Sequence, residues 1–588
     1  MIIEICCKDG ETILQVCQRE HIFSENVCGG KGICGKCKVR MLSNVVPASG
    51  ENEIFFSEAE LEEGWRLACL AKPQGMCQIE FPVEREEEMS VVTDSFLGDV
   101  IKGGKGKEIS TAMTESEVYI TNKQICENEC DRNETQKIHI ENSNEDRKEI
   151  SNGKNTNDDK KASSDTENNP ASKNNPASKN AIIIDIGTTT IAMQLILCEQ
   201  DDSKEWKTEV LATYTAVNSQ RAYGADVLSR IQASNEGKGE LLQNSILETL
   251  AKGLEALETN TPVEAIFLAG NTTMVHLLMG YSCEMLGRAP FKPVATESIQ
   301  TDAPSLFSSD RNKKAYLSEK AYKGIENATA YIFPGISAFV GGDIVAGLYY
   351  TGFYKEREVQ LLIDLGTNGE MVLGNRMRML AASTAAGPAF EGGGLSCGCA
   401  GIKGAICGAE LLKNGTWKLT TIGGGEPVGI CGSGIVEILY ELLQKGLMDD
   451  TGLLAEGNLD RVDLVGETVY ITQQDIRQFQ MAKAAIRAGV ETLMQTYGAE
   501  IEDVSRIYIA GGFGYYLNLQ KATAIGLFPN SFLGKMTAIG NSSLAGLREY
   551  ATARDEGKLL NIKKYTGDCQ LAENSCFQEK YIECMYFS

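Results

Sequence analysis

Histidine is scarce in this chain, which has only His21, His139 and His276 among its 588 residues. Imidazole is the usual base for hydroxyl nucleophiles and a frequent ligand of catalytic zinc, so the scarcity argues against both kinds of site. His276 lies in the apolar run TTMVHLLMG, where we expect a hydrogen-bonded core residue.

Long apolar runs and an excess of positive charge are also missing. No run reaches the roughly 18 residues of a membrane span, and no early stretch has the pattern of a signal peptide. Lys and Arg number 56 against 80 Asp and Glu, giving a net charge of −24. This balance argues against nucleic acid or an anionic membrane as the main partner. We therefore expect a soluble, cytoplasmic protein with neither partner.

Two common nucleotide-binding motifs are absent as well. The sequence has no GxxxxGK[ST], which excludes a Walker A loop, and no GxGxxG at its first predicted strand-to-helix turn, which argues against a dinucleotide-binding fold. Any nucleotide site in this chain must therefore be built from other glycine-rich turns.

Cysteine, by contrast, is plentiful, with 19 residues. In a long cytosolic chain, closely spaced cysteines favour metal ligands over disulfides. Cys28, Cys34 and Cys37 form C-x5-C-x2-C and Cys69 follows, which predicts the four thiolates of a [2Fe–2S] cluster. The first spacing is one residue longer than the plant-type C-x4-C-x2-C. A structural zinc site is the alternative, and Cys77 is the alternative to Cys69 as fourth ligand.

The residues around these cysteines predict an α+β ferredoxin domain of the β-grasp type over residues 1–85. MIIEICC and CQIEFPV are expected strands, and residues 11–21 an amphipathic helix. Residues 86–180 are expected to be a linker, largely disordered from about 126, because this polar stretch with its repeated NNPASK offers little apolar surface to bury.

From Ala181 onward, strands and helices alternate, which predicts a layered α/β architecture. The expected strands end in glycine or turn at a Gly/Thr pair: they are AIIIDIGTTTIAMQLILC from Ala181, VEAIFLAG (263–270), VQLLIDLG (359–366) and RIYIAGG (506–512). The expected helices cover 246–258, 435–446 and 474–498.

Two of these turns resemble each other, and each places an aspartate at a strand end before Gly-Thr. Exposed amides and threonine hydroxyls in such turns can grip phosphate, and the aspartates can hold Mg²⁺ directly or through water. Two copies indicate two related halves facing one cleft. The predicted residues are Asp185, Gly187, Thr188 and Thr189 in the first loop, and Asp364, Gly366, Thr367 and Asn368 in the second.

Other segments are predicted to complete the nucleotide site. Gly511 and Gly512 follow a buried strand and would allow an adenosine moiety to approach the backbone. Glu370 is a candidate to orient the attacking water, with a solvated loop carboxylate as the alternative. Further candidate contacts are Gly432 and Gly434 before a helix, and Lys483 and Arg487 on one helical face.

With these motifs in view, the chain resembles the reductive activators of corrinoid proteins. The resemblance covers residues 1–82 and about 181–550, through segments such as AIIIDIGTTTIAM, LAGNTTMVHLLMG, LLIDLGTNGEMVLGN, STAAGPAFEGGGLSCG and YIAGGFGYYLN. It implies an actin-like (ASKHA) two-lobed ATPase, with a first lobe or middle domain at 181–357 and a C-terminal lobe at 358–588.

The resemblance also implies a function. Such a protein would use ATP and one electron from its [2Fe–2S] cluster to reduce a Co(II) corrinoid to Co(I) on a partner methyltransferase component. It would need an upstream low-potential electron donor, and a homodimer is left open. Two alternatives stay open: a nucleotide-dependent redox-sensing or chaperone-like binding protein, and a small-molecule kinase fused to a ferredoxin.

Overall fold

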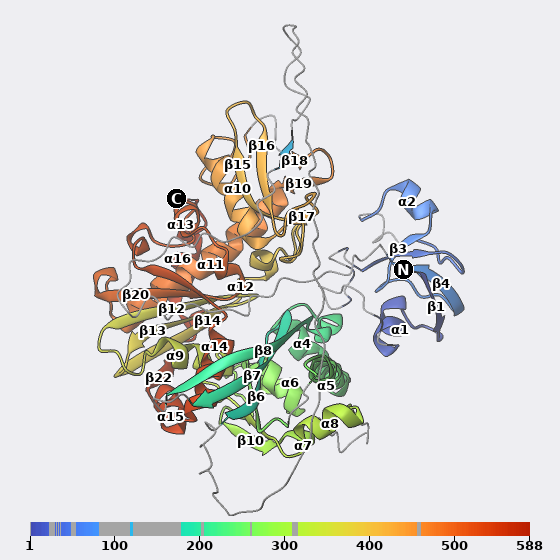
Figure 1. Ribbon diagram of the computed structural model, residues 1–588. Helices are drawn as coiled ribbons and strands as arrows, with labels where there is room; N and C mark the ends of the chain where they lie inside the picture. Colours follow the sequence, from blue (N-terminus) through green and yellow to red (C-terminus); the bar gives the residue numbers. More distant parts are fainter. Residues whose placement is uncertain are drawn as a thin grey trace, which may run out of the picture.

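The computed structural model describes residues 2–20, 22, 30, 32, 35, 37–48, 55–81, 118–120, 178–200, 205–258, 262–307, 316–455 and 460–587. The N-terminal part is a four-stranded sheet with two short helices (Figure 1). In sheet order its strands are β1 (Ile2–Cys7), β4 (Gly75–Glu80), β2 (Lys38–Met41) and β3 (Trp65–Leu67), and its helices are α1 (Ile13–Arg19) and α2 (Glu58–Glu62).

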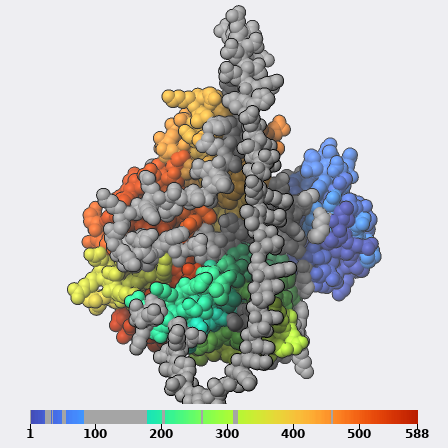
Figure 2. All heavy atoms as spheres, in the orientation of Figure 1, coloured from blue at the N-terminus to red at the C-terminus, as the bar shows by residue number. Residues whose placement is uncertain are grey.

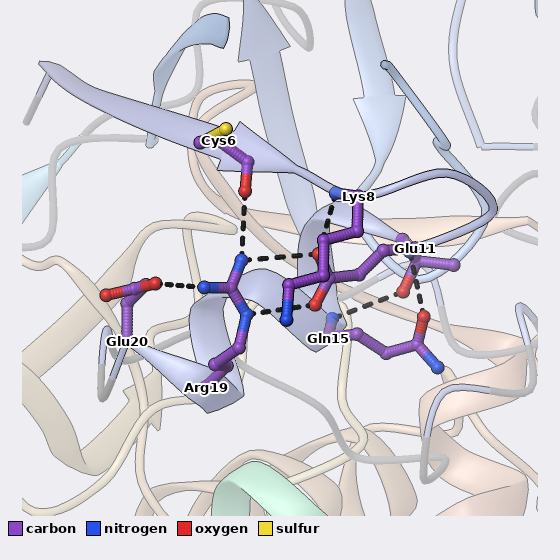
Figure 3. Close-up of polar contacts among 7 residues, drawn as sticks. Cys6, Lys8, Glu11, Gln15, Arg19 and Glu20 are labelled. Carbon is purple, nitrogen blue, oxygen red and sulfur yellow. Dashed lines mark hydrogen bonds and ion pairs between the residues drawn. The ribbon is translucent and has the colours of Figure 1, made fainter. Parts of the chain in front are cut away.

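Helix α1 begins at a capping box and is fixed to the end of β1 by one arginine. The Arg19 guanidinium donates to the Cys6 carbonyl at 2.9 Å and to Glu11 at 3.0 Å, and it also contacts Glu20 (Figure 3). The opposite face of the helix is apolar, and Ile13, Val16 and Cys17 are fully buried. Burial of this face against the sheet supplies most of the helix's stability, since exposed ion pairs contribute little.

Two six-stranded mixed sheets form the rest of the core, and they have the same internal arrangement. In both, a central strand pairs in parallel with one neighbour and in antiparallel fashion with the next strand along the chain. The first sheet has the order β10 (Ile299–Asp302), β11 (Thr329–Ile332), β9 (Ala265–Gly270), β6 (Ser178–Ile186), β7 (Thr190–Gln200) and β8 (Trp206–Val217). The second has the order β21 (Met536–Gly540), β20 (Val504–Ala510), β12 (Val359–Leu365), β13 (Gly369–Asn375), β14 (Arg378–Thr384) and β22 (Thr566–Asp568).

Helices cover both sheets, and two of the helices join the sheets. The first sheet carries α4 (Val227–Ala233), α5 (Gly239–Ala256), α6 (Thr272–Met279), α7 (Ala303–Leu306) and α8 (Glu319–Ile325). The second carries α11 (Gln473–Tyr497), α12 (Gly512–Tyr515) and α15 (Glu556–Tyr565). Helix α10 (Gly432–Gln444) packs on β15 (Ala405–Leu411), α13 (Leu519–Ala524) packs on α10, and α16 (Ser575–Glu583) packs on α11. Between the sheets lie α9 (Gly342–Thr351) and α14 (Ser542–Ala553), in one shared apolar core.

Close approach of α9 and α14 depends on glycine. A Cβ atom on Gly546 would clash with the Ala346 carbonyl, and one on Gly347 would lie 2.8 Å from the Ser542 hydroxyl. The two helices follow β11 and β21, which hold equivalent places in the two sheets. The molecule therefore has two related halves that meet along these helices, with the first half (green) below the second (orange to red) in Figures 1 and 2.

A smaller sheet lies beside the second half. It has the order β17 (Gly429–Ile430), β15 (Ala405–Leu411), β16 (Trp417–Thr421) and β5 (Val118–Ile120), and β18 (Arg461–Val465) pairs with β19 (Val469–Thr472) nearby. Strand β5 comes from the predicted linker. The rest of that linker up to residue 177, including the stretch expected to be disordered, lies outside the described residues.

The predicted fold class is confirmed: an α+β N-terminal domain precedes a two-halved α/β region. Each expected strand and helix is present, with boundaries shifted by a few residues; the predicted helix 246–258, for example, begins earlier, at Gly239. Among the described helices, none combines the length and the apolar character needed to cross a membrane.

Candidate functional site: a cleft between two related hairpins

A cleft of about 360 Å³ lies where the two halves meet. Four helices of eight residues or more begin at its wall: α6, α9, α10 and α14. Free backbone amides at helix N-termini favour anions, and here several of them converge on one space. The cleft is therefore suited to a polyanionic ligand such as a nucleotide.

Both predicted phosphate loops line this cleft. The first loop joins β6 to β7 and the second joins β12 to β13. Tight turns form them: the Gly187 amide donates to the Thr190 carbonyl at 2.9 Å, and the Gly366 amide to the Asn368 carbonyl at 3.0 Å. The cleft-lining residues among those predicted for the loops are Asp185, Gly187, Thr188, Thr189, Asp364, Gly366, Thr367 and Asn368.

Four carboxylates meet in the deepest part of the cleft: Asp185, Asp343, Asp364 and Glu370. Burial raises the pKa of Asp343 to about 7, and the Asp185 charge adds to this. Burial also raises the pKa of Asp364 to about 7, with help from the charges of Asp343 and Asp185. Burial also raises the pKa of Glu370 well above its usual value, and the charges of Asp343 and Asp364 add to this. These four carboxylates thus concentrate negative charge that a cation would neutralise.

Glu370 belongs to strand β13 and is buried, so the interpretation of a solvated loop carboxylate is wrong. Its carboxylate accepts a hydrogen bond from the Ser383 hydroxyl at 3.3 Å. Asp364 and Glu370 are paired residues on adjacent strands, which explains why both side chains reach the same cavity. The tight turn between these two strands and their pairing bring the two side chains together.

Asp185 differs from the other three carboxylates because the opposite half supplies it with donors. The Asn541 amide donates to one carboxylate oxygen at 2.9 Å and the Ser543 hydroxyl to the other at 2.8 Å. These bonds oppose the rise in the pKa of Asp185 that burial causes. Both donors lie at the start of α14, where Asn541 also caps the helix through the Leu544 amide.

Sequence reasoning missed Asp343, Glu391, Asn541 and Ser543. Asp343 lies in the first turn of α9, whose N-cap Gly341 makes no side-chain hydrogen bond, whereas Asn541 is itself the N-cap of α14. An asparagine cap directly after a strand was therefore the signal available for Asn541 and Ser543. Glu391 lies in a short 3₁₀ helix, Pro388–Glu391, which is too short to show a repeating pattern of apolar residues in the sequence.

The glycine-rich third element also lies at the cleft. Gly511 has φ = 90°, and a Cβ atom there would lie 2.5 Å from the Leu365 carbonyl and 2.8 Å from the Asp364 carboxylate. Only glycine fits this close crossing of β12. Gly512, Phe513 and Gly432 line the same cavity.

Three predicted nucleotide contacts lie elsewhere. Gly434 allows α10 to pack on the Ile406 carbonyl and is not among the residues that line the cleft. Lys483 is fully buried, and its ammonium donates to the Cys584 and Tyr586 carbonyls at 2.7 and 2.5 Å. Arg487 pairs with Glu491. Helix α11 presents both basic side chains to the C-terminal segment, so they are not part of the proposed nucleotide site.

At the N-terminal domain, the structure describes two of the four predicted cluster ligands. The sulfur atoms of Cys37 and Cys69 are 3.3 Å apart and both residues are buried, whereas Cys28 and Cys34 lie outside the described residues. A hydrogen bond from Cys69 lowers the pKa of Cys37 to about 7. Cys77, the alternative fourth ligand, instead contacts the Ser43 carbonyl at 3.2 Å.

The described part of the cysteine loop has the backbone that wrapping a cluster requires. Gly30, Gly32 and Gly35 have φ values of 84°, 75° and 68°, a region that favours glycine. A Cβ atom on Gly30 would lie 4.0 Å from the Cβ atom of Cys69, so the loop passes directly beside the fourth predicted ligand. The thiol pair and the loop therefore fit a [2Fe–2S] cluster held by cysteine.

The acidic cleft fits a magnesium nucleotide in a similar way. Oxygen donors suit Mg²⁺, which keeps several waters and takes only one or two protein carboxylates together with phosphate oxygens. Although four carboxylates line the cleft, no three or more His, Cys, Asp or Glu side chains of the described residues are placed so as to hold a metal ion by themselves.

Fold and site together define an iron–sulfur protein with an ASKHA-type nucleotide-binding region. Three family models match in succession: "2Fe-2S iron-sulfur cluster binding domain" over 2–74, "RACo middle region" over 180–356, and "C-terminal domain of RACo the ASKHA domain" over 358–588. The chain belongs to the family of reductive activators of corrinoid proteins.

Similar proteins agree with this assignment. The chain is 33% identical over 439 residues to the corrinoid activation enzyme RamQ of Eubacterium limosum, covering 68% of this chain and 69% of that protein. It is 27% identical over 429 residues to the [Co(II) methylated amine-specific corrinoid protein] reductase of Methanosarcina barkeri, covering 68% and 76%. The solved structure of a reductive activator for a corrinoid, iron–sulfur protein has the same fold, with a TM-score of 0.59, 24% identity and coverage of 99% and 96%.

Proposed function

We propose that this protein is an ATP-dependent reductive activator that passes one electron from its cluster to the Co(II) corrinoid of a partner protein, giving Co(I). The observation that carries the proposal is the pairing, in one chain, of a buried cysteine pair with two phosphate loops that face one acidic cleft. The partner is a corrinoid-binding methyltransferase component, in line with the names of the relatives.

ATP is the substrate of the cleft. The amides and hydroxyls of both loops and the four helix N-termini would hold its phosphates, and Gly511 and Gly512 would leave room for the adenosine. Asp364 and Asp185 are the proposed carboxylates for Mg²⁺, with waters and phosphate oxygens completing the shell. Glu370, whose raised pKa suits it to accept a proton, is placed to orient the attacking water.

Cys28, Cys34, Cys37 and Cys69 would hold the cluster, which supplies one-electron transfer when bound. An upstream low-potential donor must restore each electron. ATP makes the transfer favourable by binding more tightly to the conformation that engages the partner, because a ligand can shift an equilibrium only through such a difference in affinity. The two halves, joined by α9 and α14, are the elements that would close.

The test is formation of Co(I), followed by its absorption band in an isolated Co(II) corrinoid protein. We expect the band only when reductant, cluster-loaded protein and ATP are all present. Asp364→Asn should abolish the stimulation by ATP and leave the cluster spectrum unchanged, whereas Cys69→Ser should remove the cluster spectrum and leave ATP binding intact. Asp450→Asn, at an exposed aspartate outside the cleft, is the control.

Absence of the band with every corrinoid protein tried would contradict the proposal. Release of ADP stimulated by a sugar or an organic acid would instead indicate a kinase. An ATPase stimulated by peptide and insensitive to loss of the cluster would indicate a chaperone-like binding protein.

A further inference from the structure

Both phosphate loops contact the same carboxylate oxygen. Glu391 accepts a hydrogen bond from the Thr189 hydroxyl at 2.7 Å and another from the Thr367 hydroxyl at 2.8 Å, both on Oε2. The two hydroxyls are themselves 3.0 Å apart. One threonine comes from each loop, so a single anionic oxygen bridges the two halves at the residues expected to grip phosphate.

The surroundings of this oxygen are built for an anion. Arg230 is fully buried beneath the first loop and donates to the Thr188 carbonyl at 2.6 Å and to the Gly224 carbonyl at 2.9 Å, both uncharged acceptors. Burial lowers the pKa of Arg230 to about 9 and nearby Arg221 adds to this, while the charges of Asp226 and Glu391 oppose it. Arg221 also lines the cleft. The charge of Arg230 therefore favours negative charge at the position of Glu391.

Glu391 ends a short helix that is bounded by glycines and anchored in the core by Phe390. Glycines with positive φ stand on both sides of the short helix that ends at Glu391: Gly387 has φ = 84° and Gly392 has φ = 74°. The Gly387 amide donates to the Thr367 carbonyl at 3.0 Å, which ties the segment to the second loop. Phe390, the neighbour of Glu391, stacks on Phe513, which follows Gly511 and Gly512, at 4.8 Å between ring centroids.

We infer that the Glu391 carboxylate occupies the position of an oxygen of the terminal phosphate of ATP, and that ATP displaces it. The inference rests on the proposed function, since it assumes that ATP is the ligand. When the terminal phosphate takes this position, the Glu391 carboxylate loses its hydrogen bonds to Thr189 and Thr367. Segment 387–394 is then held less firmly by the two loops, so its mobility depends on whether the third phosphate is bound. ADP, which lacks that phosphate, leaves Glu391 in place. Glu391 is thus a positioning residue that distinguishes ATP from ADP.

The experiment measures the Kd of ATP and of ADP, with Mg²⁺, for the full-length cluster-loaded protein. Glu391→Ala removes the competing carboxylate, so we expect ATP to bind about tenfold more tightly, the effect of losing hydrogen bonds to a charged group, while ADP binding is unchanged. Glu391→Gln keeps the size of the side chain and removes its charge, and should give a smaller shift in the same direction. Glu426→Ala, at an exposed glutamate outside the cleft, should leave both values unchanged.

Hydrogen exchange of residues 387–394 is the second measurement, and a merely structural role would not reproduce its pattern. In the wild-type protein, ATP and not ADP should speed exchange of this segment; in Glu391→Gln, exchange should be fast without nucleotide. An unchanged ratio of ATP to ADP affinity in both variants, or slower exchange with ATP, would overturn the inference. If neither the wild type nor any variant bound ATP, the proposed function itself would fail.

Discussion

The two phosphate-loop hairpins share a strand order and a motif, yet their aspartates have different surroundings. Asp185, at the end of β6, accepts hydrogen bonds from Asn541 and Ser543 at the start of α14. Asp364, at the end of β12, has the carboxylate of Asp343 from the start of α9 as a neighbour, and its pKa is raised to about 7. The start of α14 thus supplies two neutral donors to Asp185, whereas the start of α9 brings negative charge to Asp364, where the Ser542 hydroxyl opposes the rise in pKa only in part.

From the sequence motif alone, both aspartates are equal candidates for holding Mg²⁺. Their different surroundings distinguish them. Donors from the opposite half fix the position of Asp185, so it connects the halves. Asp364 lies among carboxylates that need a cation, so it is the stronger candidate for holding Mg²⁺. The two copies of the motif therefore share a backbone geometry, while the residues that contact each aspartate from α9 and α14 give the two aspartates different roles.

The largest effect is expected from Asp364→Asn. Loss of this charge should lower the ATP-stimulated rate of Co(I) formation by about 10²–10³-fold, the range for removing one electrostatic contact to a reacting phosphate. The rate at saturating ATP is the measurement. Asp185→Asn should cost less, because the new amide oxygen still accepts from Asn541 and its NH2 can donate to the Ser543 hydroxyl. A larger loss in Asp185→Asn than in Asp364→Asn would reverse the assignment of roles.

A change at α14 can make the surroundings of Asp185 resemble those of Asp364. Asn541→Asp keeps the helix cap, since aspartate also accepts from the Leu544 amide, but it places a carboxylate against Asp185. The substitution removes the hydrogen bond from Asn541 to Asp185 and brings two negative charges together. We therefore expect ATP binding, measured by calorimetry at pH 8, to weaken by about tenfold, the cost of losing a hydrogen bond to a charged group. Ser543→Ala, which removes one donor without adding charge, is the matched control and should have a smaller effect.

Thermal unfolding against pH tests the raised pKa values in the absence of nucleotide. Asp343 and Asp364 titrate near 7 in the folded state but near 3.8 in the unfolded chain, so between these pH values the folded state binds more protons. Their contribution therefore makes the protein less stable as the pH rises from about 4 to 7. We expect Asp364→Asn to raise Tm at pH 8 and to change it little at pH 4. Equal shifts at both pH values would contradict the raised pKa.

The smallest effect concerns the first glycine of each loop. A Cβ atom on Gly187 would lie 2.7 Å from the Thr190 carbonyl, so the turn must shift, whereas one on Gly366 would lie 3.7 Å from its nearest neighbour, the Asn368 carbonyl. Gly187→Ala should weaken ATP binding severalfold and Gly366→Ala should leave it nearly unchanged. Equal Kd values for the two variants would show that the loops are sterically equivalent.

Much of this architecture could be predicted because its signals are local. Buried strands such as β12 are continuous apolar runs that end in Asp-x-Gly, and α11 begins and ends close to where its period predicts. Lys483 shows where local reasoning fails. Its helical spacing from Arg487 suggested a shared nucleotide contact, but the C-terminal carbonyls lie nearer, and nothing within one helix indicates what packs against it.

The sequence by itself determined the C-x5-C-x2-C spacing of Cys28, Cys34 and Cys37, the two Asp-x-Gly-Thr turns and the alternation of strands and helices, because each depends on residues within about ten positions of one another. Tertiary structure alone decided that Asp343 and Glu391 join the predicted carboxylates in the cleft, which aspartate receives donors from the opposite half, and that Glu391 joins Thr189 to Thr367. These contacts join residues that are distant in the chain, and they form only when α9 and α14 bring the two halves together.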